Sequence, residues 1–451
     1  MLASRVAMLA IGIFILFAAL PLGSSAALPA YCGAPPVDVP AAAAPSDMDL
    51  RFLILTTRHG DRTPVSLYPG GSSSNDVEWR CNLTHLSSID TGDAAQVQPG
   101  RLFRKRYLND RQVLPGDCMF GQLTTKGREQ HLTLGNSLRQ VYVDKYGFLG
   151  KQFSSDEVWV RSTDVPRTIA SAQSLLSGMY LPSDSQSTEV PAFDLHTIDA
   201  WMDNMTPNTR LCPHLQQVYY ELRQTPGWIA HMREIAPLDA KIRSIFNLPS
   251  NASLDIIDAF DETYARICHG KRLPEGINSL AQAIALNAQF EMAYFYNQTQ
   301  VASALGIGSF VAEQVARLEQ AVNGQAGGLK LAYFSGHDTT HDVGTDSTVT
   351  STVWPLSFAY GFGSIEYWPP YASHMEIELW QSRSGSRDFY VRFFFNGRPM
   401  PTLGCNTPGP CPWNTFRQAI ADVIPPRFPQ QCAQNVTPAA AASDLSFLRL
   451  R

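Results

Sequence analysis

The chain has 451 residues, 44% of them hydrophobic and 17% charged, so it can bury a large core and is not a disordered polymer. Its formal net charge of −5 excludes the strongly basic surface that nucleic-acid-binding proteins usually carry. Any positive field must therefore be local and come from a few clustered arginines.

The N-terminal segment predicts export from the cytosol. Arg5 precedes an almost wholly apolar run from Val6 to Leu22, and small residues follow that suit cleavage after Ala26 or Ala27. We therefore expect residues 1–27 to be a signal peptide. An uncleaved anchor is the alternative, because the apolar run approaches the length of a membrane span. Residues 28–48 are rich in Pro and Ala, which predicts a flexible leader.

The apolar run Leu50–Leu55 predicts the first strand of the core, and a polar loop follows it. In this loop Arg58 and Arg62 lie on either side of His59. Guanidinium groups meet phosphate oxygens bidentately, and a neutral imidazole between them can attack phosphorus. The loop therefore predicts a site for a phosphoryl group.

Two more short apolar runs end in polar, ionisable clusters. Val158–Val160 leads into Arg161, and Leu331–Phe334 leads into His337 and Asp338. In open α/β sheets, ligands bind outside the carboxyl ends of the strands. The three clusters could therefore meet in one pocket, although each could also be an ordinary surface loop.

The rest of the chain adds helices and a late hairpin. Ser171–Tyr180 predicts a helix, and Leu215–Phe310 has helical periodicity throughout. Met375–Trp380 and Phe389–Phe395 predict two paired strands, because apolar residues alternate along the first of them.

The motifs R-H-G-D-R-T-P from Arg58, R-S-T-D-x-x-R-T from Arg161 and G-H-D-T-T from Gly336 resemble those of the histidine acid phosphatases. This family is branch 2 of the histidine phosphatase superfamily. The likeness runs from about Asp49 to Cys432 and is strongest to the prostatic and lysosomal type.

The resemblance implies an α/β fold with a central mixed sheet flanked by helices, as in phosphoglycerate mutase, and an inserted, mainly helical cap. The core would span 49–190 and 311–435, the cap 191–310 and a C-terminal tail 436–451. The cap and the excursion Pro69–Gly116 would shape the mouth of the pocket.

The resemblance also implies the role of each site residue. His59 would be the nucleophile that becomes phosphohistidine, and Asp338 the acid that protonates the leaving group. Arg58, Arg62 and Arg161 would bind the phosphate, and His337 would add a hydrogen bond to it. Because a carboxylic acid must be protonated before it can donate, these roles imply a mildly acidic working range.

Export makes the eight cysteines candidates for disulfides. The resemblance implies the pairs Cys405–Cys411 and Cys212–Cys432, and parity and position suggest Cys81–Cys118. The family partner of Cys268 would fall at His374, so Cys268 either pairs with Cys32 or remains a free buried thiol.

Export also makes five Asn-x-Ser/Thr triplets candidate glycosylation sites: Asn82, Asn204, Asn251, Asn297 and Asn435.

We expect a secreted or endomembrane acid phosphatase that hydrolyses phosphomonoesters through phosphohistidine without a cofactor. The alternatives are a phytase or inositol-phosphate phosphatase of the same family and a non-catalytic phosphoanion-binding protein. His337 and His341 have the spacing of two metal ligands on a helix, but the preceding strand and glycine favour a phosphatase loop, so no metal is expected. Beyond the phosphomonoester substrate we expect neither nucleic acid nor, after signal cleavage, membrane as a partner, and a homodimer is left open.

Overall fold

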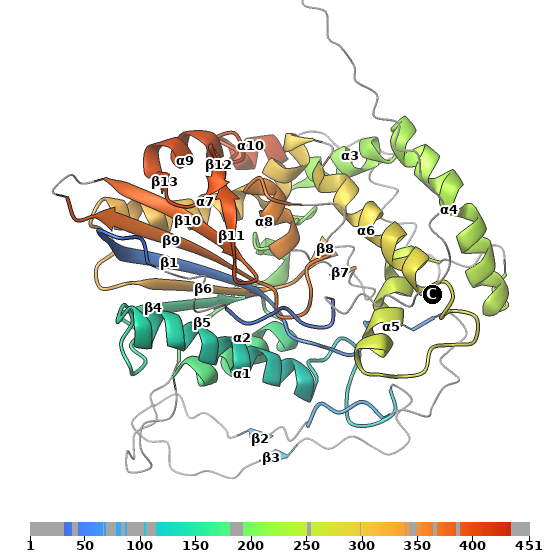
Figure 1. The fold of residues 1–451 in the computed structure, drawn as a ribbon. Helices are drawn as coiled ribbons and strands as arrows, with labels where there is room; N and C mark the ends of the chain where they lie inside the picture. Colours follow the sequence, from blue (N-terminus) through green and yellow to red (C-terminus); the bar gives the residue numbers. More distant parts are fainter. Residues whose placement is uncertain are drawn as a thin grey trace, which may run out of the picture.

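The computed structural model describes residues 31–37, 44–65, 67–68, 78–82, 86–87, 103–104, 114–180, 193–249, 254–297, 299–338, 340–341, 349–350, 352–363, 368–384 and 388–433. These residues form a central sheet with helices on both faces and a further group of helices beside one end of the sheet (Figure 1). The expected fold class, a mixed sheet flanked by helices with a helical addition, is therefore confirmed.

The central sheet is mixed, and its strands run in the order β12-β11-β10-β9-β1-β6-β4-β5, with β13 paired to β10. The strands are β1 (Met48–Arg58), β4 (Val158–Ser162), β5 (Leu195–His196), β6 (Leu331–Gly336), β9 (His374–Ser382), β10 (Phe389–Phe395), β11 (Arg398–Thr402), β12 (Cys405–Pro408) and β13 (Cys411–Pro412). β1, β6, β4 and β5 are parallel, whereas β9 pairs antiparallel with β1 and with β10. All five strands predicted from the sequence are present.

Helices cover both faces of the sheet, so β1 is buried on both sides. One face holds α1 (Thr125–Arg139), a following π-helical turn (Gln140–Lys145) and α2 (Pro166–Met179), and the other holds α7 (Gln300–Val322), α8 (Val353–Ala359) and α9 (Trp413–Ile420). Successive strand residues point to opposite faces. Phe52 and Ile54 accordingly pack in the α7 core, while Leu53 and Leu55 pack in the α1–α2 core.

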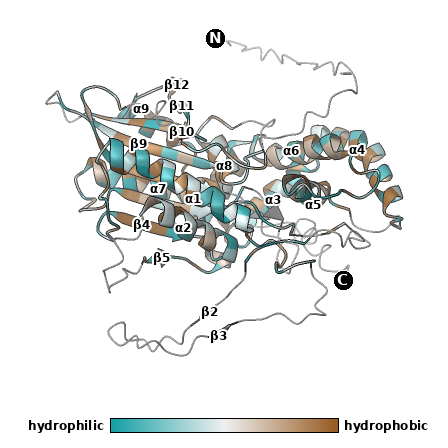
Figure 2. Cartoon of the chain, turned by 60° about the horizontal axis from the view of Figure 1, so that its bottom comes forward, coloured by the Kyte–Doolittle hydropathy of each residue, from teal (hydrophilic) through white to brown (hydrophobic). Residues whose placement is uncertain are grey.

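Four helices lie beside the carboxyl ends of the parallel strands, to the right in Figure 1: α3 (Pro213–Leu222), α4 (Pro226–Ile245), α5 (Ile256–Cys268) and α6 (Ala281–Asn297). A 3-10 turn (Ala200–Met202) precedes α3, and α10 (Phe428–Cys432) packs against α3 and α7. The expected end of the cap at residue 310 falls inside α7, which packs on the sheet through Phe310 and Val315. Figure 2 shows α4, α5 and α6 together at one end of the molecule. We call α3–α6 the cap helices.

Two short pairs of strands lie outside the central sheet: β2 (Leu86–Ser87) with β3 (Phe103–Arg104), and β7 (Thr340–His341) with β8 (Val349–Thr350).

All eight cysteines are paired, as Cys32–Cys268, Cys81–Cys118, Cys212–Cys432 and Cys405–Cys411. Within the described ranges no helix has both the length and the hydropathy that a membrane span requires. The apolar run Val6–Leu22 lies outside these ranges.

Residues 31–37 differ from the flexible leader that the composition predicts, because they pack against the core. Tyr31 and Val37 are buried. The Ala34 amide donates to the Tyr371 carbonyl at 2.7 Å, and the Val37 amide donates to the Ser137 hydroxyl at 3.2 Å.

Candidate active site

The three predicted strand ends meet because β1, β6 and β4 are neighbours in register. Arg58 lies opposite Gly336, and Ser162 lies opposite Ser335. The loop that follows β1 is fixed from two sides. The His59 amide donates to the Gly336 carbonyl at 2.9 Å, and the Ala372 amide donates to the His59 carbonyl at 3.0 Å.

His59 is held in the tautomer that suits a nucleophile. Its Nδ1 lies 2.8 Å from the Gly60 carbonyl, which can only accept, so Nδ1 carries the proton. Its Nε2 therefore has a lone pair, and this buried atom has no hydrogen-bond partner among the described residues. The imidazole thus presents an unengaged nucleophilic nitrogen.

The environment also keeps His59 neutral. Burial lowers its pKa well below the usual value, and the positive charges of Arg167, Arg58 and Arg62 lower it further. The same causes, burial first and then Arg167, lower the pKa of His337. Both imidazoles consequently remain uncharged in mildly acidic solution, where a free histidine would be protonated.

Arg58 and Arg62 both lie buried at the loop and are held by partners from other parts of the chain. Arg58 donates to the Pro369 carbonyl at 2.5 Å and to the Tyr31 hydroxyl at 3.0 Å. Arg62 forms an ion pair of 2.7 Å with Asp261 of α5. A cap helix therefore directly positions one of the two arginines of the loop.

The third arginine beside the imidazoles is Arg167, not the expected Arg161. Arg167 belongs to the first turn of α2, and its Nη2 lies 3.3 Å from Nδ1 of His337. Arg161 is engaged elsewhere, because its guanidinium contacts Asp203 at 2.7 Å and Glu313 of α7 at 2.5 Å. The assignment of Arg161 to the phosphate site is therefore corrected.

Strand alternation explains this correction. Val158 and Val160 point to the α1–α2 core, so Arg161 points to the opposite face with Trp159. The sequence motif contained both arginines. The sequence did contain a sign that favours Arg167 as the phosphate ligand. Arg167 follows Pro166 at the start of a helix, where backbone N–H groups and the helix dipole favour anions.

His337 and Asp338 follow β6 and face the loop from its other side. Because Arg167 can only donate, His337 Nδ1 accepts, and its Nε2–H donates to the Thr163 hydroxyl at 2.9 Å. Asp338 forms an ion pair of 2.7 Å with Arg58, and its Oδ1 lies 3.8 Å from His59 Nε2. An acid and a nucleophile therefore lie next to each other beyond the ends of the neighbouring strands β1 and β6.

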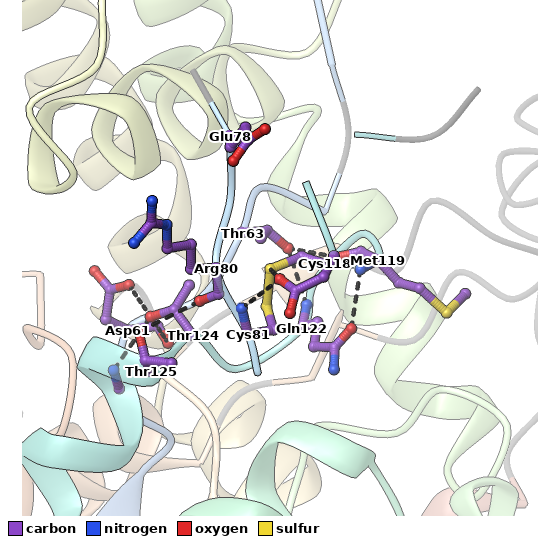
Figure 3. The surroundings of a disulfide bond; sticks show 12 residues. Asp61, Thr63, Glu78, Arg80, Cys81, Cys118, Met119, Gln122, Thr124 and Thr125 are labelled. Carbon is purple, nitrogen blue, oxygen red and sulfur yellow. Dashed lines mark hydrogen bonds between the residues drawn. A yellow bond between two sulfur atoms is a disulfide. The ribbon is translucent and has the colours of Figure 1, made fainter. Parts of the chain in front are cut away.

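The loop is anchored to the start of α1 at the base of the excursion (Figure 3). The Thr124 hydroxyl donates to Asp61 Oδ1 at 2.6 Å, and the Thr63 hydroxyl donates to the Met119 carbonyl at 2.6 Å. A side chain at Gly60 is excluded, because its Cβ would lie 2.3 Å from the Gly127 carbonyl oxygen. The Cys81–Cys118 disulfide closes this base next to the loop.

Asp61 links the loop to the cap. Besides Thr124 it contacts His269, the residue after α5, and Lys126 lies 3.8 Å from its second oxygen. The contact with His269 could not be predicted from the motif, because the two residues lie 208 positions apart. His131 and His374 support the backbone nearby: His131 Nε2–H donates to the Arg58 carbonyl at 3.0 Å, and His374 pairs with Glu376 at 2.5 Å.

His337 and His341, which have the spacing of two metal ligands on a helix, do not share a helix, because His337 follows β6 and His341 lies in β7. In the described part of the chain, one group of three donor residues has its atoms close enough for a metal ion: Cys81, Asp117 and Cys118. Its two sulfur atoms are joined in a disulfide, which removes the thiolates that a metal would require.

The candidate glycosylation sites lie in different surroundings. Asn82 and Asn297 are exposed, whereas Asn251 and Asn435 lie outside the described residues. The Asn204 side chain belongs to the Arg161 network, since its Oδ1 accepts from Arg161 at 2.8 Å and its Nδ2 lies 3.5 Å from Glu313.

Comparison with known proteins gives consistent matches over most of the chain. The family model of the histidine phosphatase superfamily (branch 2) matches residues 49–396. Counting factor 60 of Dictyostelium discoideum is 35% identical over 90% of this chain and 93% of its own length. Human lysosomal acid phosphatase is 27% identical over 85% of this chain and 80% of its own. Bovine lysophosphatidic acid phosphatase type 6 is 25% identical over 86% and 87%.

Among solved structures, a Hafnia alvei phytase in its apo form has a TM-score of 0.53 and is 15% identical, covering 87% of this chain and all of that one. A Klebsiella phytase has a TM-score of 0.53 and 14% identity over 86% of this chain and 98% of that one. At this level of identity these two likenesses show a shared fold.

Proposed function

The chain belongs to branch 2 of the histidine phosphatase superfamily, and we propose that it hydrolyses phosphomonoesters through a phosphohistidine at His59. The state of His59 carries the proposal: a buried, neutral imidazole presents a lone pair at Nε2 and lies within the field of Arg58, Arg62 and Arg167. Nucleophilic attack needs this lone pair, and the arginines supply the charge that a phosphoryl group requires.

In the first step, Arg58, Arg62 and Arg167 bind the oxygens of the transferred group. His59 Nε2 forms a bond to phosphorus while the bond to the ester oxygen breaks. The protonated Asp338 gives its proton to that oxygen, so the leaving group departs as an alcohol. Arg58 must turn from its ion pair with Asp338 toward the phosphate, and the incoming negative charge then favours the protonated carboxyl.

In the second step, water attacks phosphorus on the phosphohistidine and the bond to Nε2 breaks. The ionised Asp338 accepts a proton from the water, which restores the acid and releases inorganic phosphate. Positioning and charge carry most of the catalysis in such a reaction. The three arginines provide the charge stabilisation that metal ions provide in other phosphatases, so the proposed mechanism needs no metal.

The groups that approach the loop from the cap favour substrates with a single phosphate. Asp261 and Glu262 of α5 reach the loop region, where Asp261 holds Arg62 and Glu262 accepts from the Tyr68 amide. Glu262 is also paired with Arg266 at 2.7 Å, so α5 offers further phosphate groups no uncompensated positive charge. A phytase or inositol-phosphate phosphatase would need a wide basic pocket there, and it remains the alternative within this family.

Export to an oxidising compartment is part of the proposal. Four disulfides within the described residues suit the secretory pathway, where thiols are oxidised. A lysosomal acid phosphatase is among the relatives of the chain. We infer that the protein is secreted or lumenal and that residues 1–27 are removed as a signal peptide.

The test is to trap the intermediate. Wild-type protein turning over a ³²P-labelled aryl phosphate at acidic pH, with a chelator present throughout, should carry label on His59 after rapid quenching and alkaline peptide mapping. His59→Ala should take up no label and release no phosphate. Label on a serine or an aspartate, or a rate that returns only when zinc or magnesium is added, would overturn the mechanism.

The same assay separates the alternatives. A non-catalytic phosphoanion-binding protein would bind phosphate but release none from the aryl ester. A phytase would hydrolyse inositol hexakisphosphate with a higher kcat/KM than glycerol phosphate or phosphotyrosine. We expect the reverse order, because Arg62 of the loop and Arg266 of α5 are already paired with carboxylates of α5.

A further inference from the structure

Asp338 receives two N–H groups at the same oxygen. Its Oδ2 lies 2.7 Å from Nη2 of Arg58 and accepts from the indole Nε1–H of Trp368 at 2.7 Å. Its other oxygen, Oδ1, lies 3.8 Å from Nε2 of His59. The carboxyl group therefore has one oxygen held by donors and one oxygen on the side of the nucleophile.

This division decides where a proton can reside. An oxygen whose lone pairs accept two N–H groups can take a proton only by giving up one of them. We propose that Trp368 is a positioning residue for the acid: its indole N–H keeps Oδ2 as an acceptor, so that the proton of Asp338 is carried on Oδ1, facing the scissile bond. The inference rests on the proposed role of Asp338 as leaving-group acid.

Trp368 becomes the more important donor once substrate binds. When Arg58 turns to the phosphate, the indole N–H still donates to Oδ2 and so favours the proton on Oδ1. In the first step the Oδ1 proton passes to the ester oxygen as the phosphorus–oxygen bond breaks and the Nε2–phosphorus bond forms. The new carboxylate then keeps the indole hydrogen bond, which stabilises its charge until a proton returns from the attacking water.

The surroundings of Trp368 suit a fixed orientation. The side chain is 4% exposed, and its ring centroid lies 4.3 Å from Phe260 of α5 and 5.1 Å from Trp354 of α8. The next residue, Pro369, accepts the second Arg58 hydrogen bond through its carbonyl. Packed aromatic rings lose little further freedom when they make such a bond, so the N–H is aimed before substrate arrives.

Trp368→Phe keeps the ring and removes the N–H. We expect phosphohistidine formation, measured in single turnovers, to slow by on the order of 10-fold for an alkyl phosphate and much less for an activated aryl phosphate. The loss of a donor to the charged form should also move the alkaline limb of the alkyl-ester pH profile to higher pH. KM should change little. Trp368→His, which retains a ring N–H, should recover part of the alkyl rate.

Trp380→Phe is the matched control. The Trp380 indole donates to Glu378 at 2.8 Å from a side chain that is 2% exposed, so this variant removes an equivalent buried bond in β9, outside the site. It should leave the pH profile and the alkyl-to-aryl ratio unchanged. Two results would overturn the inference. One is an equal shift of the pH profile in Trp368→Phe and Trp380→Phe, and the other is an unchanged alkyl-to-aryl rate ratio in Trp368→Phe.

A measurement on wild-type protein covers the case in which Trp368→Phe does not fold. The chemical shift of the Trp368 indole ¹H–¹⁵N resonance should change with pH, with the same midpoint as the alkyl-ester rate. A chemical shift that stays constant through this pH range would exclude the inference. Failure of the proposed function looks different, because wild-type protein would then form no phosphohistidine. If Asp338→Asn selectively slows alkyl esters and Trp368→Phe does not, only the role of Trp368 is wrong.

Discussion

The two arginines of the second motif, Arg161 and Arg167, face different partners and should therefore respond differently to replacement. Arg167→Lys keeps the charge but loses the planar fork beside His337, so we expect kcat/KM for an aryl phosphate to fall by about 10²–10³-fold. Arg161→Lys should stay within a few-fold of wild type, because its contacts are to Asp203 and Glu313. An equal loss of kcat/KM in the two variants would show that Arg161 also acts in the active site.

The chemistry of the site could be predicted from the sequence, but the direction of this side chain could not. The motif brings two arginines within seven residues, and choosing between them needs the position of Glu313, which lies 152 residues from Arg161. Trp368 was missed for a similar reason. Its partner Asp338 lies 30 residues away, and an isolated tryptophan in a loop is more often a packing residue.

His131 gives the acid stability of the protein a specific dependence on pH. Burial lowers its pKa to about 4, although its bond to the Arg58 carbonyl acts in the opposite direction. Near pH 7 the imidazole is neutral in both folded and unfolded chains. As pH falls below about 6.5, only the unfolded chain takes up the proton. The folded state therefore loses stability until the pH reaches the pKa of His131 in the folded protein.

His131→Asn should remove this contribution. The slope of unfolding free energy against pH, from urea titrations between pH 6.5 and 4, should decrease by up to about 1.4 kcal/mol per pH unit. A general loss of packing would lower the unfolding free energy at every pH without changing its slope against pH. The slope therefore distinguishes the loss of the His131 titration from a loss of packing. An unchanged slope would mean that folded and unfolded chains bind the His131 proton equally.

At the scale of elements, the leader 31–37 brings Tyr31 to Arg58 and is tied to the cap by Cys32–Cys268. Replacing both cysteines with serine should lower the unfolding free energy by about 2–5 kcal/mol, because the unfolded chain regains a long loop. It should also lower kcat/KM by about 2–10-fold, since Arg58 loses a hydrogen-bonding partner when the leader detaches.

Cys212–Cys432 provides the control for this prediction. It spans 220 residues, against 236 for Cys32–Cys268, so the loop-closure entropies are nearly equal. The double serine variant of this pair should lose similar stability in urea unfolding and keep its kcat/KM. Equal activity in both double variants would show that the leader does not position Arg58.

The strands were predictable from two patterns: short apolar runs mark the parallel strands, which are covered on both faces, and alternating apolar residues mark β9. The packed leader was not, because its partners Ser137 and Tyr371 lie far along the chain and its own composition is that of a loop. The cap boundary expected at residue 310 lies inside α7 and not at the end of a helix, for a different reason. Apolar residues recur at helical spacing along the whole of α7, and periodicity alone does not say which part packs on the sheet.

For the whole molecule, the meeting of three strand ends followed from the general behaviour of α/β sheets, and the structure confirms it. The approach of the cap to that point could not be derived from the sequence. It depends on Asp261 reaching Arg62 and His269 reaching Asp61, contacts that join segments about two hundred residues apart.

The two long disulfides also determine how the molecule would carry a mechanical load. Cys32 is bonded to Cys268, and Cys432 is bonded to Cys212, so both ends of the core are covalently fastened to the cap helices. Tension applied between these ends runs from Cys32 to Cys268, back along the chain to Cys212 and out through Cys432. The sheet and the catalytic loop lie off this path. The oxidised protein could therefore be stretched through α3, α4 and α5 while its catalytic centre bears no direct tension through the backbone.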